Sequence, residues 1–105
     1  MTPEAVWTSR AEVDLLREFS RLEDFSENSG YQLLELVDSA LRLLRMMPEM
    51  APHYTHHYRR LVLRDRRFGL FYSVEQRGIV LHAVCDLRQD RETILRHLGI
   101  RPDEG

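Results

Sequence analysis

The residues best suited to chemistry in this sequence are arginines gathered in one short stretch. Residues 58–67 contain five arginines and a single acid. Guanidinium groups stay charged at any biological pH and bind carboxylate or phosphate through a planar fork. Because side chains alternate along a strand, Arg60 and Arg64 are expected on one sheet face, with Arg66 and Arg67 in the following turn. The pattern predicts a surface that docks phosphates or an acidic peptide, or else a solvated face whose arginines pair with local acids.

Side chains from neighbouring strands are expected to extend this arginine surface. Tyr72 and His82 would lie beside the arginines, and His82 fits either the surface or a satisfied position within the sheet. The acids Glu75, Asp86 and Asp90 fall in turns or at a helix start, without an evident partner. The arginine surface is therefore the strongest candidate site that the residues indicate.

Other residues with catalytic or metal-binding chemistry lack the partners that such sites need. His53, His56 and His57 form a cluster without a Cys-x-x-Cys or His-Glu-x-x-His motif, so an exposed polar loop is expected rather than a metal site. Cys85 stands among apolar neighbours, which raise a thiol pKa. The sequence also contains neither a nucleophile elbow nor a phosphate-binding glycine loop. The residues alone predict a binding module without metal or cofactor.

Two amphipathic helices are expected to support the surface. Ser9 and Glu12 fit a capping box, and behind them apolar residues recur at intervals of three and four. The predicted apolar stripe is Ala11, Leu15, Leu16, Phe19, Leu22 and Phe25. A second helix is expected over 29–47, with a weaker capping box at Ser29 and Gln32, and Pro48 ends it. The short loop between the helices predicts an antiparallel hairpin.

The second half of the chain is expected to form the sheet that covers this hairpin. Strands are predicted over 58–64, 68–74 and 79–85, and the tight turns between them indicate an antiparallel meander. A short strand opens the chain, and a last helix begins after Asp90 and ends at Gly99. The predicted fold class is α+β, in the order β-α-α-β-β-β-α, with an antiparallel sheet packed on a two-helix hairpin. One domain is expected over 1–105, with 101–105 as a frayed tail.

Length, charge and cysteine content limit the class of protein. The 105 residues suit one small domain that buries its own core. All 15 basic residues are arginine, against 17 acids, and ten of the arginines fall after residue 57. A single cysteine cannot form an internal disulfide, which favours the cytoplasm. No apolar run approaches the roughly 20 residues that span a bilayer, and the start lacks a signal-peptide pattern, so no membrane or secreted protein is expected.

Taken in order, these segments resemble the RelE/ParE superfamily of type II toxins. The likeness covers about residues 5–98 and rests on the ordered set rather than on one motif. It is carried by Val6–Leu15, Leu44–Pro48, Tyr58–Leu63, Phe68–Val74 and Ala83–Asp90. The resemblance implies the fold already predicted, a cytoplasmic toxin and a cognate antitoxin that neutralises it.

The resemblance is nearer to the ParE (plasmid stabilisation) branch than to the RelE branch. RelE-type relatives cut mRNA on the ribosome and place two lysines on the first meander strand, where this chain has Arg60 and Val62. Gly69 replaces an arginine of those relatives, and the last helix has Ile94 but no tyrosine. Arg88 does match their arginine after the last strand. ParE-type members lack that catalytic set and bind DNA gyrase, and their longer hairpin is similar to the one expected here.

The leading hypothesis is therefore a ParE-like toxin that inhibits DNA gyrase by binding, with no metal or cofactor. The residues expected to bind the target or the antitoxin are Tyr58, Arg60, Arg64, Arg66, Arg67, Tyr72, His82 and Arg88. One alternative is a RelE-like ribosome-dependent mRNA endoribonuclease, and another is a non-toxic degenerate member that only binds an antitoxin. A homodimer and a toxin–antitoxin hetero-oligomer both stay open.

Overall fold

The order of helices and strands confirms the predicted α+β fold class. A computed structural model describes residues 3–101 and residue 103, so most of the tail expected at 101–105 lies outside the described residues. The elements are β1 (Ala5–Trp7), α1 (Ser9–Phe25), α2 (Ser29–Met46), β2 (Arg59–Val62), β3 (Phe68–Glu75), β4 (Gly78–Asp86) and α3 (Arg91–His97). Among the described residues, no helix has the length and apolar character needed to cross a membrane.

The four strands form one mixed sheet in the order β1-β4-β3-β2. β2, β3 and β4 form the predicted antiparallel meander. β1, however, pairs in parallel with β4, placing Ala5 opposite Ile79, so the sheet is not wholly antiparallel. Gly78 has φ +119°, and a Cβ atom at that residue would lie 2.4 Å from the carbonyl oxygen of Glu4. Glycine at the start of β4 is thus what allows β1 to come this close.

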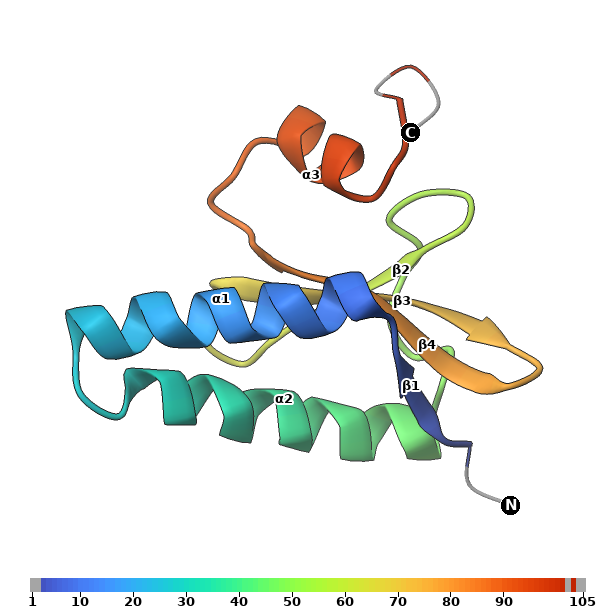
Figure 1. Ribbon diagram of the computed structural model, residues 1–105. Helices are drawn as coiled ribbons and strands as arrows, with labels where there is room; N and C mark the ends of the chain where they lie inside the picture. Colours follow the sequence, from blue (N-terminus) through green and yellow to red (C-terminus); the bar gives the residue numbers. More distant parts are fainter. Residues whose placement is uncertain (1–2, 102, 104–105) are drawn as a thin grey trace.

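The helices are distributed over both faces of the sheet. Figure 1 shows α1 and α2 side by side as the expected hairpin, with α3 apart from them beyond α1. Apolar side chains of α1, α2 and the sheet form the main core, whose buried members are Ala11, Leu33, Val37, Ala40, Leu44, Ala51, Leu63, Phe68, Leu70, Tyr72, Ile79, Leu81 and Val84. Burial of each large side chain of this kind stabilises the fold by about 1.5–3 kcal/mol.

The capping box predicted at the start of α1 is wrong by one residue. Thr8, not Ser9, is the cap, and its hydroxyl oxygen accepts a hydrogen bond from the Ala11 amide at 3.1 Å. The same hydroxyl donates to the carbonyl oxygen of Leu81 at 3.0 Å. Thr8 therefore joins the helix start to β4, which is a long-range contact that local sequence spacing does not reveal.

The second predicted capping box, at the start of α2, is also wrong. Asn28 is the cap residue, with a left-handed backbone at φ 71°, and its side chain makes no capping hydrogen bond. Instead, a Glu23 carboxylate oxygen accepts a hydrogen bond from the Gly30 amide at 2.7 Å. A carboxylate from the preceding helix thus satisfies one amide of the first turn, and the Gln32 amide, which Ser29 was expected to cap, donates to the carbonyl oxygen of Asn28 instead.

The predicted apolar stripe of α1 is only partly buried. Leu16 is 66% exposed and Phe25 is 91% exposed, whereas Asp14 and Glu18 are buried. Asp14 and Glu18 follow Ala11 at helical spacing, so they occupy the helix face that turns toward the sheet. The sequence predicts this helix correctly. The helix face that packs against the sheet, however, is the one that carries Ala11, Asp14 and Glu18, and it coincides only in part with the predicted apolar stripe.

The sheet face opposite the hairpin is covered rather than solvated. Phe71, Ala83 and Cys85 pack there against Ile94 and Leu98 in a second core. The half-buried residues around it are Tyr54, Tyr58, Leu87 and Ile100. α3 and the segment after α2 therefore close most of the surface on which the arginines were expected to stand exposed.

Candidate functional site

Tyr72 does not belong to the arginine surface that the sequence predicted. Its side chain is fully buried in the main core, and its hydroxyl donates a hydrogen bond to the Pro48 carbonyl oxygen at 2.8 Å. Burial raises the pKa of the Tyr72 phenol above its usual value. The hydroxyl holds the chain where α2 ends, and Tyr72 is unable to reach a partner on the far face.

His82 is the extra residue of a β-bulge. Phe71 pairs with Ala83 and Tyr72 with Leu81, so no β3 residue stands opposite His82 in the strand register. Its Nε2 lies 2.8 Å from the Ser73 hydroxyl oxygen, and its ring packs edge-on against Tyr58 at 4.8 Å between centroids.

The surroundings of His82 keep its imidazole neutral more readily than usual. Burial lowers the pKa of His82, although the carboxylate of Glu75 acts in the opposite direction. The Ser73 hydroxyl lies 2.6 Å from an oxygen of Glu75 and donates a hydrogen bond to it. His82 and Tyr58 are thus brought together as predicted, within a small network of hydrogen bonds and ring contacts.

Arg67 and Arg88 share one acid, and this contradicts the expectation that Asp86 lacks a partner. The Oδ2 atom of Asp86 lies 3.2 Å from Arg67 Nε and 2.8 Å from Arg88 Nη2. Burial acts to raise the pKa of Asp86, but hydrogen bonds from Arg88 and Arg67 outweigh it and leave this pKa below its usual value. These two arginines follow the simpler interpretation, in which surface cations pair with local acids.

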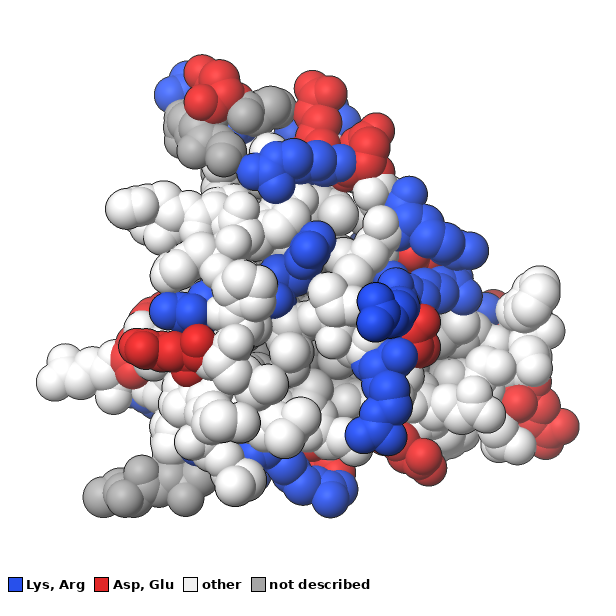
Figure 2. All heavy atoms as spheres, turned by 180° about the vertical axis from the view of Figure 1, so that it is seen from behind, with Lys and Arg blue, Asp and Glu red and all other residues white. Residues whose placement is uncertain are grey.

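The other predicted arginines keep their charge available. Arg64 and Arg66 are exposed at the turn between β2 and β3, where Arg66 has φ +62°. Arg60 lies on the outer sheet face with its guanidinium carbon 5.1 Å from the centre of the Tyr54 ring. Within the described residues, none of these three arginines forms an ion pair. Figure 2, the view from behind Figure 1, shows several basic side chains in a column toward one side of that face and others standing separately among uncharged side chains.

An apolar groove runs between α2 and β2, and sequence reasoning did not identify it. This β2 groove is lined by Leu36, Ser39, Ala40, Leu43, Leu61, Val62, Leu63 and Arg64. Leu43 and Val62 are 44% and 39% exposed, which is high for apolar side chains of this size. The sequence shows that the second helix is apolar around much of its circumference. Which side of this helix the sheet leaves uncovered, however, depends on where the sheet packs.

β2 is the last strand of the sheet, yet little of its outer edge is free. The Arg60 amide donates to the Pro52 carbonyl oxygen at 3.1 Å, and His53 forms an isolated bridge with Arg59. Within the described part of the chain, the end of β2 at Leu61 and Val62 borders the groove without such a neighbour. A partner would therefore rely on side-chain packing more than on strand addition.

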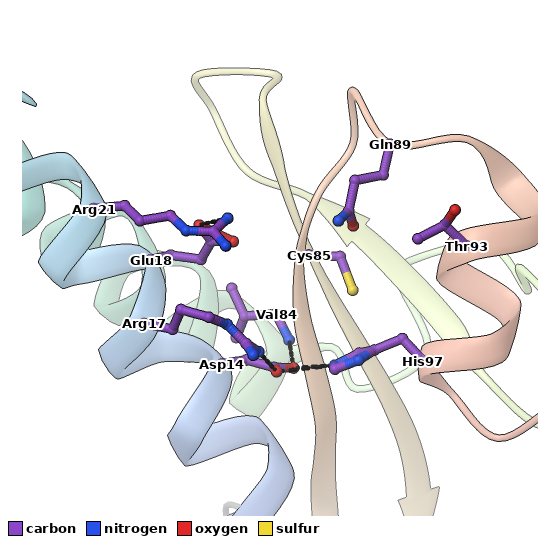
Figure 3. Close-up of a pocket in the computed structure, with 9 residues that line it drawn as sticks. All are labelled: Asp14, Arg17, Glu18, Arg21, Val84, Cys85, Gln89, Thr93 and His97. Carbon is purple, nitrogen blue, oxygen red and sulfur yellow. Dashed lines mark hydrogen bonds and ion pairs between the residues drawn. The ribbon is translucent and has the colours of Figure 1, made fainter.

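A second hollow, between α1, β4 and α3, is built around a buried acid that the sequence did not single out. We call it the seam; it is lined by Asp14, Arg17, Glu18, Arg21, Val84, Cys85, Gln89, Thr93 and His97 (Figure 3). Asp14 is 1% exposed and accepts hydrogen bonds from the Val84 amide at 3.0 Å and from Arg17 Nη2 at 2.6 Å. The Nε2 atom of His97 lies 2.8 Å from Asp14 Oδ2.

The hydrogen bonds of Asp14 connect α1, β4 and α3. Among the side chains that line the seam, none is an obvious reactive group. Cys85 lines it, and burial, with the charges of Asp14 and Glu18, raises the pKa of this thiol to about 12, as its apolar position predicted. Glu18 is ion-paired with Arg21 at 3.6 Å. Among the described residues, no group of three or more His, Cys, Asp or Glu side chains is placed to hold a metal ion, in the seam or near His53.

A third hollow, the Tyr54 cleft, lies on the outer face between the loop after α2 and the start of α3. It is lined by His53, Tyr54, Arg60, Leu87, Gln89, Arg91 and Ile94. Of these, only Arg60 was among the predicted binding residues, because the loop that carries Tyr54 gave no periodic signal.

Comparison with known proteins confirms the fold. No known family and no curated protein matches the sequence. Among solved structures, the fold is similar to a chain of the chromosomal ParDE TA system from P. aeruginosa, with a TM-score of 0.70 and 15% sequence identity. The match covers 81% of this chain and 96% of that chain. At this identity the likeness is one of fold, and it agrees with the fold that the sequence resemblance implied.

Proposed function

We propose that this chain is the toxin of a type II toxin–antitoxin system, of the ParE kind, which inhibits DNA gyrase by binding and is neutralised by a cognate antitoxin. The observation that carries the proposal is the shared fold with a chain of a ParDE system over nearly the whole of that chain. The ordered sequence segments that resemble the superfamily support it independently.

The positions at which RelE-type relatives carry catalytic groups favour binding over mRNA cleavage. Gly69 is buried against Leu87, and a Cβ atom at residue 69 would lie 3.0 Å from the Leu87 Cδ2 atom. Ile94 is 3% exposed in the second core. These two positions are occupied by packing residues, so the acid, base and charge-stabilising groups of a ribonuclease are not assembled there.

The β2 groove is the surface that the antitoxin would occupy. Its apolar walls stand open beside Arg64, and the end of α2 carries two further exposed apolar side chains, Met46 and Met47, which are 77% and 52% exposed. An amphipathic acidic segment would bury its apolar side in the groove and pair its acids with Arg64 and Arg66. Because so little of the β2 edge is free, we expect the segment to bind as a helix.

Controlled expression in bacteria tests the proposed function. Induction of the chain should arrest growth, raise an SOS reporter and accumulate gyrase-linked DNA breaks. Co-expression of the product of the neighbouring short reading frame, if that frame encodes an acidic C-terminal half, should restore growth. The control is the same vector without the reading frame for the chain, which should leave growth and the SOS reporter unchanged.

The outcome also separates the alternatives. Cuts in mRNA at defined codon positions, abolished by Arg60→Ala or Arg88→Ala, would replace the gyrase proposal by a ribosome-dependent ribonuclease. Binding of the antitoxin without growth arrest would indicate a member that has lost toxicity.

A further inference from the structure

The turn between α1 and α2 carries negative charge that its surroundings do not balance. Residues 22–41 contain five acids and no basic residue. Asp24 and Glu27 are exposed in or beside this turn, and within the described residues neither carboxylate accepts a hydrogen bond or forms an ion pair. Figure 1 shows the turn at the end of the hairpin that lies farthest from both termini. Its charge therefore faces solvent.

The same turn also exposes an aromatic side chain. Phe25 is 91% exposed, more than any other large apolar side chain of the described residues. A phenyl ring gains free energy when it leaves water for an apolar groove. We call residues 24–27 the hairpin tip; it presents one apolar ring between two unpaired acids.

The hairpin tip is held in its conformation by the protein itself. The Ser29 amide donates to the Ser26 carbonyl oxygen at 3.1 Å, and the Gly30 amide donates to Glu23 at 2.7 Å. A Cβ atom at residue 30 would lie 2.7 Å from the Cδ2 atom of Phe19, so α2 begins in close contact with α1. Because the tip is already ordered, docking it costs little conformational entropy.

The β2 groove has the complementary features. Leu43 and Val62 form partly open apolar walls, and Arg64 also lines the groove. Arg66 is exposed in the turn that follows β2, and neither arginine has an ion pair among the described residues. An apolar groove beside two arginines thus matches an apolar ring between two acids.

We propose that the hairpin tip of one copy of this chain docks in the β2 groove of a second copy, with Phe25 between the apolar walls and the two acids of the tip paired with Arg64 and Arg66. Within one copy the two surfaces are held apart, because the tip precedes the first residue of α2 and the groove is lined by residues 36–43 of this helix. Contacts between unlike surfaces join copies into a closed ring or an open chain.

This self-association goes beyond the proposed function and does not depend on it, because only copies of this chain take part. Sedimentation velocity of the purified full chain over a range of concentrations, at low and at high salt, tests the contact. The average sedimentation coefficient should rise with protein concentration at low salt. It should rise less at high salt, since salt screens exposed ion pairs.

Substitutions on both sides of the contact should weaken it. Phe25→Ala, the double change Asp24→Asn with Glu27→Gln, and Val62→Glu should each lower the association constant at least about fivefold. All four residues are exposed, so the circular dichroism spectrum should stay that of the folded chain.

Matched controls remove the same groups elsewhere. Leu16→Ala shortens an apolar side chain that is 66% exposed on α1 but lies outside the tip. Glu12→Gln with Glu92→Gln removes two other exposed acids. Each control should leave the association constant within about twofold of the unchanged chain.

Charge reversal tests the pairing of acids with arginines. One protein carries Asp24→Arg with Glu27→Arg, and the other carries Arg64→Glu with Arg66→Glu. Each alone should stay monomeric, because its tip and groove then have charges of one sign, whereas a mixture of the two should associate. An unchanged chain that is monomeric at every concentration, losses as large in the controls, association that survives Val62→Glu, or a mixture that stays monomeric would each overturn the assignment. The assay contains neither gyrase nor antitoxin, so its failure and that of the proposed function are distinguishable.

Discussion

The seam and the β2 groove are both hollows beside a helix, yet they treat their charges in opposite ways. In the seam, Asp14 is 1% exposed and binds Arg17, His97 and the Val84 amide. In the β2 groove, Arg64 is exposed beside apolar walls and has no ion pair among the described residues. Charge that is neutralised internally holds the fold together, whereas charge left beside open apolar surface is available to a partner.

The largest expected effect concerns the closure of the seam. Because the pKa of Cys85 is raised to about 12 from 9.0, the folded protein should hold about a thousandfold less thiolate at pH 8 than the unfolded chain. Alkylation by iodoacetamide, followed by mass spectrometry with and without urea, measures this. Rapid labelling of the folded protein would show that the seam is open, and the contrast with the groove would fail.

Removal of the central acid should break the seam. Asp14→Ala leaves His97 and the Val84 amide without their partner and should lower the free energy of unfolding by about 3 kcal/mol, as measured by urea denaturation. The control is Asp38→Ala, whose exposed carboxylate pairs only with Arg42 among the described residues, and it should change stability by less than about 0.5 kcal/mol. Equal effects of the two substitutions would mean that Asp14 does not organise the fold.

A charge placed in the β2 groove should affect binding but not folding. Val62→Glu places a negative charge opposite the acidic antitoxin that we propose, and it should weaken binding of that antitoxin at least tenfold, or about 1.4 kcal/mol. Calorimetric titration measures the affinity, and the melting temperature should stay unchanged. Val13→Glu, at a 57% exposed position on α1, is the matched control and should bind normally. Weakening by Val13→Glu alone would move the docking surface to α1.

The smallest expected effect is the pH dependence of stability that His82 contributes on the outer face. The pKa of His82 is lowered by burial, so between its folded pKa and 6.5 the unfolded chain binds more protons than the folded one. Stability contributed by neutral His82 should therefore be full above pH 6.5 and decrease as the pH falls through the folded value. His82→Gln should flatten this part of the profile, and an unchanged slope would contradict the burial of the ring.

The pKa of Asp86 gives the corresponding prediction at lower pH. Hydrogen bonds from Arg88 and Arg67 hold this pKa below 3.8, so the stabilisation is full above that pH and is lost as the pH falls through the folded value. Asp86→Asn should remove this acid-labile contribution in unfolding experiments below pH 4. An identical acid profile for the two proteins would show that the shared pair with Arg67 and Arg88 is not maintained in solution.

Local patterns in the sequence were sufficient for the order of elements. Helical spacing, the stop at Pro48, the cap at Asp90 and the left-handed Gly99 all correspond to features of the structure. These signals act within a few residues, so they can be recognised without knowing what packs against them.

The features that sequence reasoning missed depend on contacts between distant residues. The parallel pairing of β1, the bulge at His82 and the inward orientation of Tyr72 follow from how strands meet, which no local spacing encodes. The burial of Asp14 depends on His97, which lies 83 residues further along the chain. The same holds for the outer face, where α3 and the segment around Tyr54 cover a surface expected to be open.

We propose that this chain acts by docking and does no chemistry of its own. Purified protein in a gyrase cleavage assay, run beside a ribosome-bound mRNA assay, tests that claim most directly. We predict that gyrase-linked DNA breaks accumulate while the mRNA stays intact. Transcripts cut at codon positions, with gyrase unaffected, would contradict it.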